Sequence, residues 1–261
     1  MIQIRTEGRK VCMIPKKNEL VTIEITDMGS SGEGIGRADG FTLFVKGAVV
    51  GDTVEVKVLK TKKTYGYAKI ERILCPSEYR VEPVCAVAGR CGGCQLQFMD
   101  YSAQLVRKEQ KVKECLERIG GVHFENAEDS SNEDGPQFLP ILGMEDFLAY
   151  RNKAQFPVGR DKGGKIVTGF YAGHSHAIIP CTTCVIQAPV NEVICKIVCE
   201  HMEKFNIAPY DEENHTGLVR HILTRVGEAT GEVLVCLIIN GKSVPKADAL
   251  TEKLREAVES F

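Results

Sequence analysis

The feature that most constrains this chain is a dense group of cysteines in the stretch CAVAGRCGGC. Cys85, Cys91 and Cys94 have the spacing C-x5-C-x2-C, and two glycines fill the short gap. Two thiolates separated by two residues can point at one metal, and glycine permits the tight backbone that this geometry needs. Tetrahedral zinc and a cubane iron–sulfur cluster both require a fourth ligand.

The stretch CTTC, far downstream, offers that ligand as Cys181 or Cys184. Two interpretations follow. Zinc would use two C-x2-C pairs, which leaves Cys85 unused, whereas an iron–sulfur cluster would keep Cys85 and take one distal cysteine. The spacing alone does not choose between them. A purely structural role for three clustered cysteines is the least favoured interpretation.

Eleven cysteines are unusual for the compartment that the rest of the sequence indicates. No apolar run approaches the roughly 20 residues that a membrane helix needs. The stretch MIQIRTEGRK at the start lacks the apolar segment of a signal peptide. We therefore expect a cytoplasmic protein without membrane contact. Thiols stay reduced in the cytoplasm, so clustered cysteines there indicate a metal site or catalysis rather than disulfides.

Residues 18–75 alternate apolar and polar side chains, as in NELVTIEITDMG, with the period typical of β-strands. Glycine and aspartate turns divide them into short strands, which predicts a small five-stranded barrel of the OB type. The glycine-rich stretch 29–40 matches no phosphate-binding motif, so we interpret it as a hairpin loop. Residues 1–75 carry 13 basic and 9 acidic side chains and form a mildly basic module.

A helix is predicted after the cysteine cluster, from a cap at Ser102 to a stop signal at Gly120. Its apolar residues recur at helical spacing. Its other faces carry four cations: Arg107, Lys108, Lys111 and Lys113. Residues 125–137 carry five acidic and no basic side chains, which predicts an exposed linker.

Residues 138–261 mix strands and helices, which predicts an α/β domain. Strand pairs are expected at 150–172 and 218–241, and helices at 188–206 and 244–261. Because the sequence ends within a predicted helix, we expect a shortened chain.

At this point the residues resemble a known family. A small barrel followed by C-x5-C-G-G-C-x-x-Q resembles the bacterial RNA uracil-C5 methyltransferases that make 5-methyluridine in 23S ribosomal RNA. The stretches YRNK, SHAIIPCTTCVIQAP and LVRHILTRVGEATGEVLVCLIIN resemble further segments of that family. The resemblance covers residues 18–245 and identifies the barrel as a TRAM domain, an RNA-binding module.

The resemblance implies a [4Fe–4S] cluster bound by Cys85, Cys91, Cys94 and Cys184, with Cys181 as the alternate fourth ligand. Methyl transfer needs no external electron donor or acceptor, so we expect the cluster to be structural and to hold the cysteine loop to the distal cysteine. The family also has a C-terminal Rossmann-like domain that binds S-adenosylmethionine and carries the nucleophilic cysteine and the general base. We find no nucleotide-binding fingerprint, so we expect that domain, and every catalytic residue, to be absent and this chain alone to be inactive.

The resemblance also implies the reaction. A cysteine thiolate adds to C6 of uracil, C5 takes the methyl group from S-adenosylmethionine, and a base then removes the C5 proton. The target base must first leave its RNA stack. We expect this chain, acting as a monomer, to grip the RNA, which is 23S ribosomal RNA by resemblance.

Together these features predict an α+β protein. Its four segments are a TRAM-like RNA-binding barrel (1–75), an iron–sulfur loop with a helix (76–124), an acidic linker (125–137), and a central α/β domain that supplies the distal cluster ligand (138–261).

RNA contacts are expected on the barrel rim and on strands of the central domain. Cations there can meet phosphates, and an aromatic ring can stack on a base. Arg151 and Lys153 are expected on the same side of one strand. Salt bridges within the protein are the alternative role for the charged pairs. The candidates are Lys46, Lys60, Lys62, Lys63, Tyr65, Arg151, Lys153, Arg220 and His221.

Two other classes of protein are considered. A zinc-stabilised RNA-binding module with no catalytic parent would be colourless, whereas a cubane cluster gives brown protein that absorbs near ~400 nm. Radical S-adenosylmethionine methylthiotransferases can also carry TRAM domains. Their C-x3-C-x2-C spacing and C-terminal TRAM domain both differ from this sequence.

Overall fold

The structure, a computed structural model, describes residues 13–124, 136–173 and 175–259. Most of the predicted acidic linker, residues 125–135, lies outside the described residues. The chain forms two compact units. The first contains residues 1–83 and 95–143, and the second contains residues 84–94 and 144–261. The segment that we treated as one module, 76–124, is thus distributed over both units.

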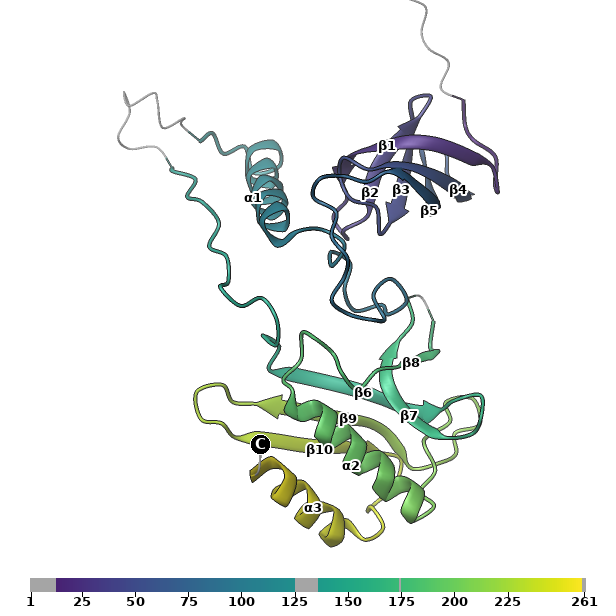
Figure 1. The fold of residues 1–261 in the computed structure, drawn as a ribbon, viewed down its shortest axis with the longest axis vertical. Coiled ribbons are helices and arrows are strands. Elements are labelled where there is room, and N and C mark those ends of the chain that lie inside the picture. Colours follow the sequence, from purple (N-terminus) through teal and green to yellow (C-terminus); the bar gives the residue numbers. More distant parts are fainter. Residues whose placement is uncertain (1–12, 125–135, 174, 260–261) are drawn as a thin grey trace, which may run out of the picture. The chain divides into compact units, whose positions relative to one another are not determined.

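The first unit is built on a closed five-stranded barrel with the strand order β1-β2-β3-β5-β4. Its strands are β1 (Leu20–Met28), β2 (Gly34–Ala38), β3 (Phe41–Lys46), β4 (Thr53–Thr61) and β5 (Tyr65–Cys75). β3 and β5 pair in parallel, and the other pairs are antiparallel (Figure 1). The predicted barrel is therefore confirmed.

The alternation in the sequence becomes the barrel interior. Ile25, Leu43 and Val56 belong to one fully buried cluster, while their chain neighbours face outward. Burying each such side chain contributes roughly 1.5–3 kcal/mol. β1 and β2 approach so closely that a Cβ on Gly36 would lie 2.5 Å from the Glu24 carbonyl oxygen, so only glycine fits there.

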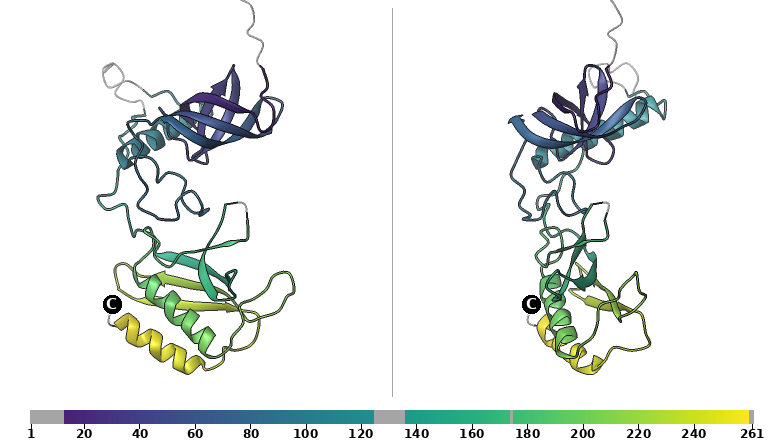
Figure 2. Two further views of the ribbon diagram at one scale, coloured as in Figure 1. Left: turned by 45° about the vertical axis from the view of Figure 1, so that its right-hand side comes forward. Right: turned by 90° about the vertical axis from the view of Figure 1, so that its right-hand side faces the viewer.

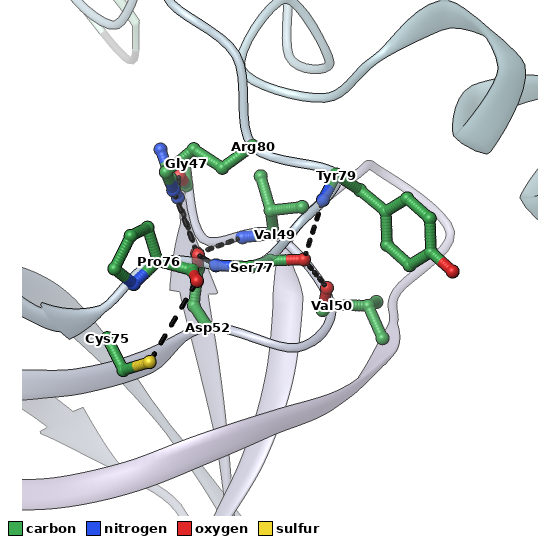
Figure 3. A network of polar contacts seen from close by, with 9 residues as sticks. All are labelled: Gly47, Val49, Val50, Asp52, Cys75, Pro76, Ser77, Tyr79 and Arg80. Carbon is green, nitrogen blue, oxygen red and sulfur yellow. Dashed lines mark hydrogen bonds and ion pairs between the residues drawn. The ribbon is translucent and has the colours of Figure 1, made fainter.

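A buried ion pair fastens the segment after β5 to the barrel (Figure 3). Asp52 is completely buried and accepts hydrogen bonds from the backbone N–H groups of Val49 (2.7 Å) and Ser77 (2.9 Å). Arg80 donates to the same carboxylate through Nε (2.9 Å) and a terminal nitrogen, and to the Gly47 carbonyl oxygen (2.8 Å). Burial by itself would raise the pKa of Asp52, but the hydrogen bonds outweigh it and lower that pKa.

Helix α1 (Tyr101–Arg118) completes the first unit. Asp100, not the predicted Ser102, is its N-cap, because the Asp100 carboxylate accepts a hydrogen bond from the Ser102 N–H at 2.9 Å. The Ser102 hydroxyl also donates to this carboxylate, and that hydrogen bond, helped by the backbone N–H, lowers the pKa of Asp100. Ala103 is the one fully buried residue of α1, and Val106 and Val112 are exposed.

The second unit is a five-stranded sheet with the order β10-β9-β6-β7-β8. Its strands are β6 (Lys153–Arg160), β7 (Ile166–Tyr171), β8 (Ile178–Pro180), β9 (Val219–Val226) and β10 (Val233–Ile239). Every pair in this sheet is antiparallel. The strand pairs predicted at 150–172 and 218–241 are present as the antiparallel pairs β6–β7 and β9–β10, joined by turns. Because no crossover helix joins a parallel pair in the described sheet, this domain is of the α+β type rather than the predicted α/β type.

Helices α2 (Val190–Lys204) and α3 (Ala247–Glu259) pack on one face of this sheet (Figures 1 and 2). Phe156 and Ile222 of the sheet and Ile194 and Val198 of α2 form the fully buried centre of the core. None of the helices in the described part of the chain combines the length and the apolar character needed to span a bilayer.

Candidate nucleic-acid interface and metal centre

Three aromatic rings gather on the outside of the barrel. The parallel register of β3 and β5 places Phe44 beside Tyr67 and Thr42 beside Tyr65. The Phe44 ring centroid lies 5.7 Å from that of Tyr65 and 5.8 Å from that of Tyr67, and the two tyrosine centroids are 5.7 Å apart. Tyr67 is 41% exposed. We call Phe44, Tyr65 and Tyr67 the aromatic triad.

Only Tyr65 of the triad was among the predicted RNA contacts. Phe44 is two residues before Lys46, and Tyr67 is two residues after Tyr65. Because alternate residues of a strand share one face, the alternation itself could have identified both as outward-facing rings. The neighbouring Tyr65 raises the pKa of Tyr67, so the Tyr67 hydroxyl stays protonated at neutral pH.

The four predicted barrel lysines lie around this triad. Lys46 ends β3, Lys60 lies in β4, and Lys62 and Lys63 occupy the turn before β5. The Lys62 N–H donates to the Tyr65 carbonyl oxygen at 2.7 Å, which holds this turn beside the triad. All four lysines are exposed, and none forms an ion pair with another described residue. Their contact with RNA stays a prediction.

The predicted pair in β9 has a different environment. A terminal nitrogen of Arg220 lies 2.6 Å from Glu212 Oε1, and the guanidinium carbon lies 5.3 Å from the Tyr210 ring centroid. The hydrogen bond from Arg220 lowers the pKa of Glu212. The intramolecular salt bridge, which the sequence left open, is thus present at Arg220. Its contact with RNA stays a prediction.

His221, the other member of this pair, is half-buried. Its Nδ1 atom is buried without a hydrogen-bond partner among the described residues. Burial lowers the pKa of His221, and the positive charge of Arg220 lowers it further. His221 is therefore neutral at neutral pH, and its contact with RNA stays a prediction.

Arg151 and Lys153 do not share one strand as expected. β6 begins at Lys153, whereas the Arg151 N–H donates to the Ile186 carbonyl oxygen at 3.0 Å in a separate bridge. Lys153 lies opposite Arg225 of β9. Sequence reasoning missed Arg225, because only the strand pairing brings it beside Lys153. The contact of Arg151 and Lys153 with RNA stays a prediction.

The first three cysteines lie in a loop that belongs to the second unit. Cys91 forms an isolated antiparallel bridge with Ala172, and the Gly92 N–H donates to the Tyr171 carbonyl oxygen at 3.0 Å. A Cβ on Gly92 would lie 3.2 Å from that oxygen, so glycine permits this close approach. The loop is thereby attached to the end of β7.

Cys181 and Cys184 follow β8, in the same unit. Burial and, to a smaller extent, the neighbouring thiols of Cys184, Cys85 and Cys91 together raise the pKa of Cys181 to about 11. Burial also raises the pKa of Cys184, as do Cys94, Cys85 and Cys91. The distal cysteines therefore lie within electrostatic range of the loop cysteines, as the predicted shared site requires.

The chemistry of these side chains suits a [4Fe–4S] cluster, because four thiols of one unit are the ligand type that such clusters take. The side chains are not gathered around one point, however. Among the described residues, no three histidine, cysteine, aspartate or glutamate side chains are close enough to hold a metal ion. The four thiols are therefore the ligand type that a [4Fe–4S] cluster needs, but in this structure they are not arranged around a common centre.

The barrel matches the family model described as TRAM domain over residues 15–70. Residues 15–70 form a TRAM domain. The four exposed lysines and the aromatic triad lie within these residues, which include all of the barrel except the end of β5.

Proteins similar to the whole chain are named RNA methyltransferases. An uncharacterized RNA methyltransferase of Clostridium tetani is 44% identical over 244 residues, which are 94% of this chain and 50% of that protein. One of Caldanaerobacter subterraneus is 41% identical over 93% of this chain and 51% of that protein. The chain spans about half the length of these curated relatives.

A solved structure shows the same fold. The tRNA (uracil-54, C5)-methyltransferase of Pyrococcus abyssi, in complex with S-adenosyl-L-homocysteine, matches with a TM-score of 0.62 and 21% sequence identity. The match covers 87% of this chain and 48% of that chain.

These matches correct our expectations of the fold class and the function. We expected a binding fragment that stops before the methyltransferase sequence and is inactive by itself. The alignments with RNA methyltransferases run over 94% and 93% of the chain, through both units, so the second unit is itself part of the matched methyltransferase sequence. The expected absence of a domain and the expected inactivity rested on the lack of a nucleotide-binding fingerprint and on the position of Phe261, which support neither, and both are withdrawn.

Proposed function

We propose that this chain acts in an S-adenosylmethionine-dependent methyltransferase that modifies C5 of a uridine in RNA. The 44% identity to an RNA methyltransferase along 94% of the chain is the observation that carries this proposal. The uracil specificity and the preference for 23S ribosomal RNA come from the resemblance of the cysteine motif and the later segments. The solved enzyme with the same fold acts on uracil 54 of tRNA, so transfer RNA is the substrate to compare.

In this proposal the TRAM domain binds the RNA. Its four candidate lysines, Lys46, Lys60, Lys62 and Lys63, form no ion pair among the described residues, and the aromatic triad leaves one ring 41% exposed. Phosphates and unstacked bases are the groups that such a surface recognises. Binding of flanking RNA would help to meet the cost, a few kcal/mol, of extruding the target base.

We also propose that Cys85, Cys91, Cys94 and Cys184 bind a [4Fe–4S] cluster, with Cys181 as the alternate fourth ligand. The attachment of the loop to β7 and the proximity of the distal thiols support this assignment. When bound, the cluster would link the loop covalently to the segment after β8. These thiols must lose their protons to bind iron, and reduced thiols persist in the cytoplasm, where we place the protein as a monomer.

The function is tested by deleting the gene that encodes this chain and measuring 5-methyluridine in purified RNA. Mass spectrometry of nuclease-digested 23S ribosomal RNA should show the loss of one or more methyluridines, and a plasmid copy of the gene should restore them. Loss of 5-methyluridine from transfer RNA instead would make transfer RNA the substrate and leave the proposed reaction unchanged. Unchanged 5-methyluridine in both RNA classes would refute the proposal.

A further inference from the structure

A cleft of about 730 Å³ lies within the first unit, between the β1–β2 loop and helix α1. The sequence predicted only a hairpin loop for this glycine-rich stretch. In the structure the loop is closed by hydrogen bonds from Gly29 N–H to the Glu33 carbonyl oxygen (2.7 Å) and from Gly32 N–H to the Gly29 carbonyl oxygen (3.1 Å). The loop is thus an ordered wall of the cleft.

The cleft continues the aromatic surface of the barrel. Phe44 lines the cleft and is also the ring that contacts both tyrosines of the triad. A Cβ on Gly29 would lie 3.2 Å from Glu33 Oε2 and 3.4 Å from the Phe44 ring, so the Glu33 carboxylate and this ring both lie beside the loop. One continuous surface therefore runs from Tyr67 through Phe44 into the cleft.

The opposite wall of the cleft is basic. It carries Arg107, Lys108, Lys111 and Arg118 of α1. Arg107, Lys111 and Arg118 follow one side of the helix, because they are four and seven residues apart. None of the four cations forms an ion pair within the described part of the chain.

Two acidic side chains also line the cleft, and both are engaged by neighbouring residues. Asp27 Oδ1 accepts a hydrogen bond from the Met28 N–H at 2.7 Å, and Glu114 Oε1 accepts one from Gln110 Nε2 at 2.9 Å. Four cations against these two carboxylates, with Glu33 beside Phe44 as a third, leave the cleft with a positive charge. An anion that also carries aromatic groups would complement both the charge and the rings.

We propose that this cleft and the aromatic triad form one binding site for single-stranded RNA. The backbone phosphates lie along the basic side of α1, and unstacked bases stack on Phe44 and Tyr67. This inference rests on the proposed function, because it names the surface on which the methyltransferase holds RNA next to its target. Paired RNA does not fit this site, because its bases are stacked on one another and offer no free face to the rings.

The experiment measures binding of the full chain to a fluorescein-labelled oligouridine of about ten nucleotides, within the range of one OB-type site. Phe44→Ala and Tyr67→Ala should each weaken binding roughly 5- to 150-fold, the effect of one lost base–aromatic stack. Lys111→Ala should weaken binding and lower the slope of log affinity against log salt by about 0.7, the effect of one lost phosphate contact in single-stranded RNA.

Matched controls separate the cleft from the general charge and aromatic content of the unit. Lys113 lies on the same helix but does not line the cleft, and Tyr79 is 42% exposed in the same unit outside the triad. Lys113→Ala and Tyr79→Ala should leave both the affinity and the salt slope close to those of the wild type. Circular dichroism of each variant establishes that the barrel is folded.

Wild-type binding with losses confined to the cleft and triad variants, and weaker binding of a duplex of equal length, would support the site. Normal wild-type binding with equal effects of cleft and control variants would overturn the site but leave the proposed function standing. A wild-type chain that binds neither the oligouridine nor the duplex would also overturn the site. The proposed reaction is tested separately, by the 5-methyluridine content of RNA from the deletion strain.

Discussion

Removal of the buried carboxylate of Asp52 should strongly lower the stability of the first unit. We predict that Asp52→Ala lowers the free energy of unfolding of this unit by about 3–5 kcal/mol. The substitution removes one partner of an ion pair in which Asp52 is 0% exposed and the Arg80 side chain only 13% exposed. The remaining guanidinium would then lie buried without a counter-charge.

The contacts around Asp52 set this magnitude. Arg80 would keep its hydrogen bond to the Gly47 carbonyl oxygen, but the backbone N–H groups of Val49 and Ser77 would lose their acceptor. Each unsatisfied buried donor costs about 1–3 kcal/mol, less where water enters. Since a domain is stable by about 5–15 kcal/mol in total, this loss is a large fraction of the whole.

The acid dependence of stability gives a second measure of the same interaction. The pKa of Asp52 in the folded state lies below its ordinary value of 3.8, so its contribution is present above that value and lost as the pH falls through the folded pKa. The difference in stability between wild type and Asp52→Ala should therefore be constant from neutral pH down to about pH 4 and should shrink below it.

The assay is hydrogen–deuterium exchange of peptides from β3 and β4, combined with urea unfolding followed by circular dichroism. Glu55→Ala is the matched control. Glu55 pairs with Arg72 at 3.0 Å, but the Arg72 side chain is 68% exposed, so this surface pair should contribute less than about 1 kcal/mol. An Asp52→Ala protein as stable as Glu55→Ala would refute the reasoning.

Three further predictions concern the second unit. Anaerobically purified chain should contain about four irons, and Cys184→Ser should lose them while Cys181→Ser keeps them; the reverse pattern would reassign the fourth ligand. Arg220→Ala should leave the urea unfolding midpoint of the second unit nearly unchanged, because its partner Glu212 is exposed, and a clear fall in that midpoint would contradict this. Burial raises the pKa of Cys199 to about 11, so iodoacetamide should modify Cys199 far more slowly at neutral pH than the exposed Cys236. The rate of Cys199 modification should rise about tenfold per pH unit up to pH 9. Equal modification rates of the two cysteines, measured by mass spectrometry, would disprove this prediction.

Much of the fold could be read from local patterns. The alternation in residues 18–75 predicted the barrel because a period of two and its turn residues are properties of each strand alone. The same reasoning located the helices at α1, α2 and α3. Turn residues gave the pairs β6–β7 and β9–β10, but pattern alone did not give the pairing of β6 with β9, since these strands are far apart in sequence and a strand of given periodicity can pair in either direction.

The site was predictable only in part, for the same reason. The spacing of Cys85, Cys91 and Cys94 is local, and the sequence shows it directly. The attachment of their loop to β7 and the ion pair of Arg220 with Glu212 depend on residues that meet only after folding. Sequence could not choose between an internal salt bridge and a free cation at Arg220.

The sequence by itself determined which residues face inward, where the chain turns, and which thiols are spaced to bind a metal, because these properties depend on near neighbours along the chain. Only the tertiary structure decided that Asp52 meets Arg80 and that Phe44 lies beside Tyr67. It also decided that α1 and the β1–β2 loop enclose a basic cleft. Such contacts join residues far apart in sequence, so their energies depend on the closure of the barrel and not on any local pattern.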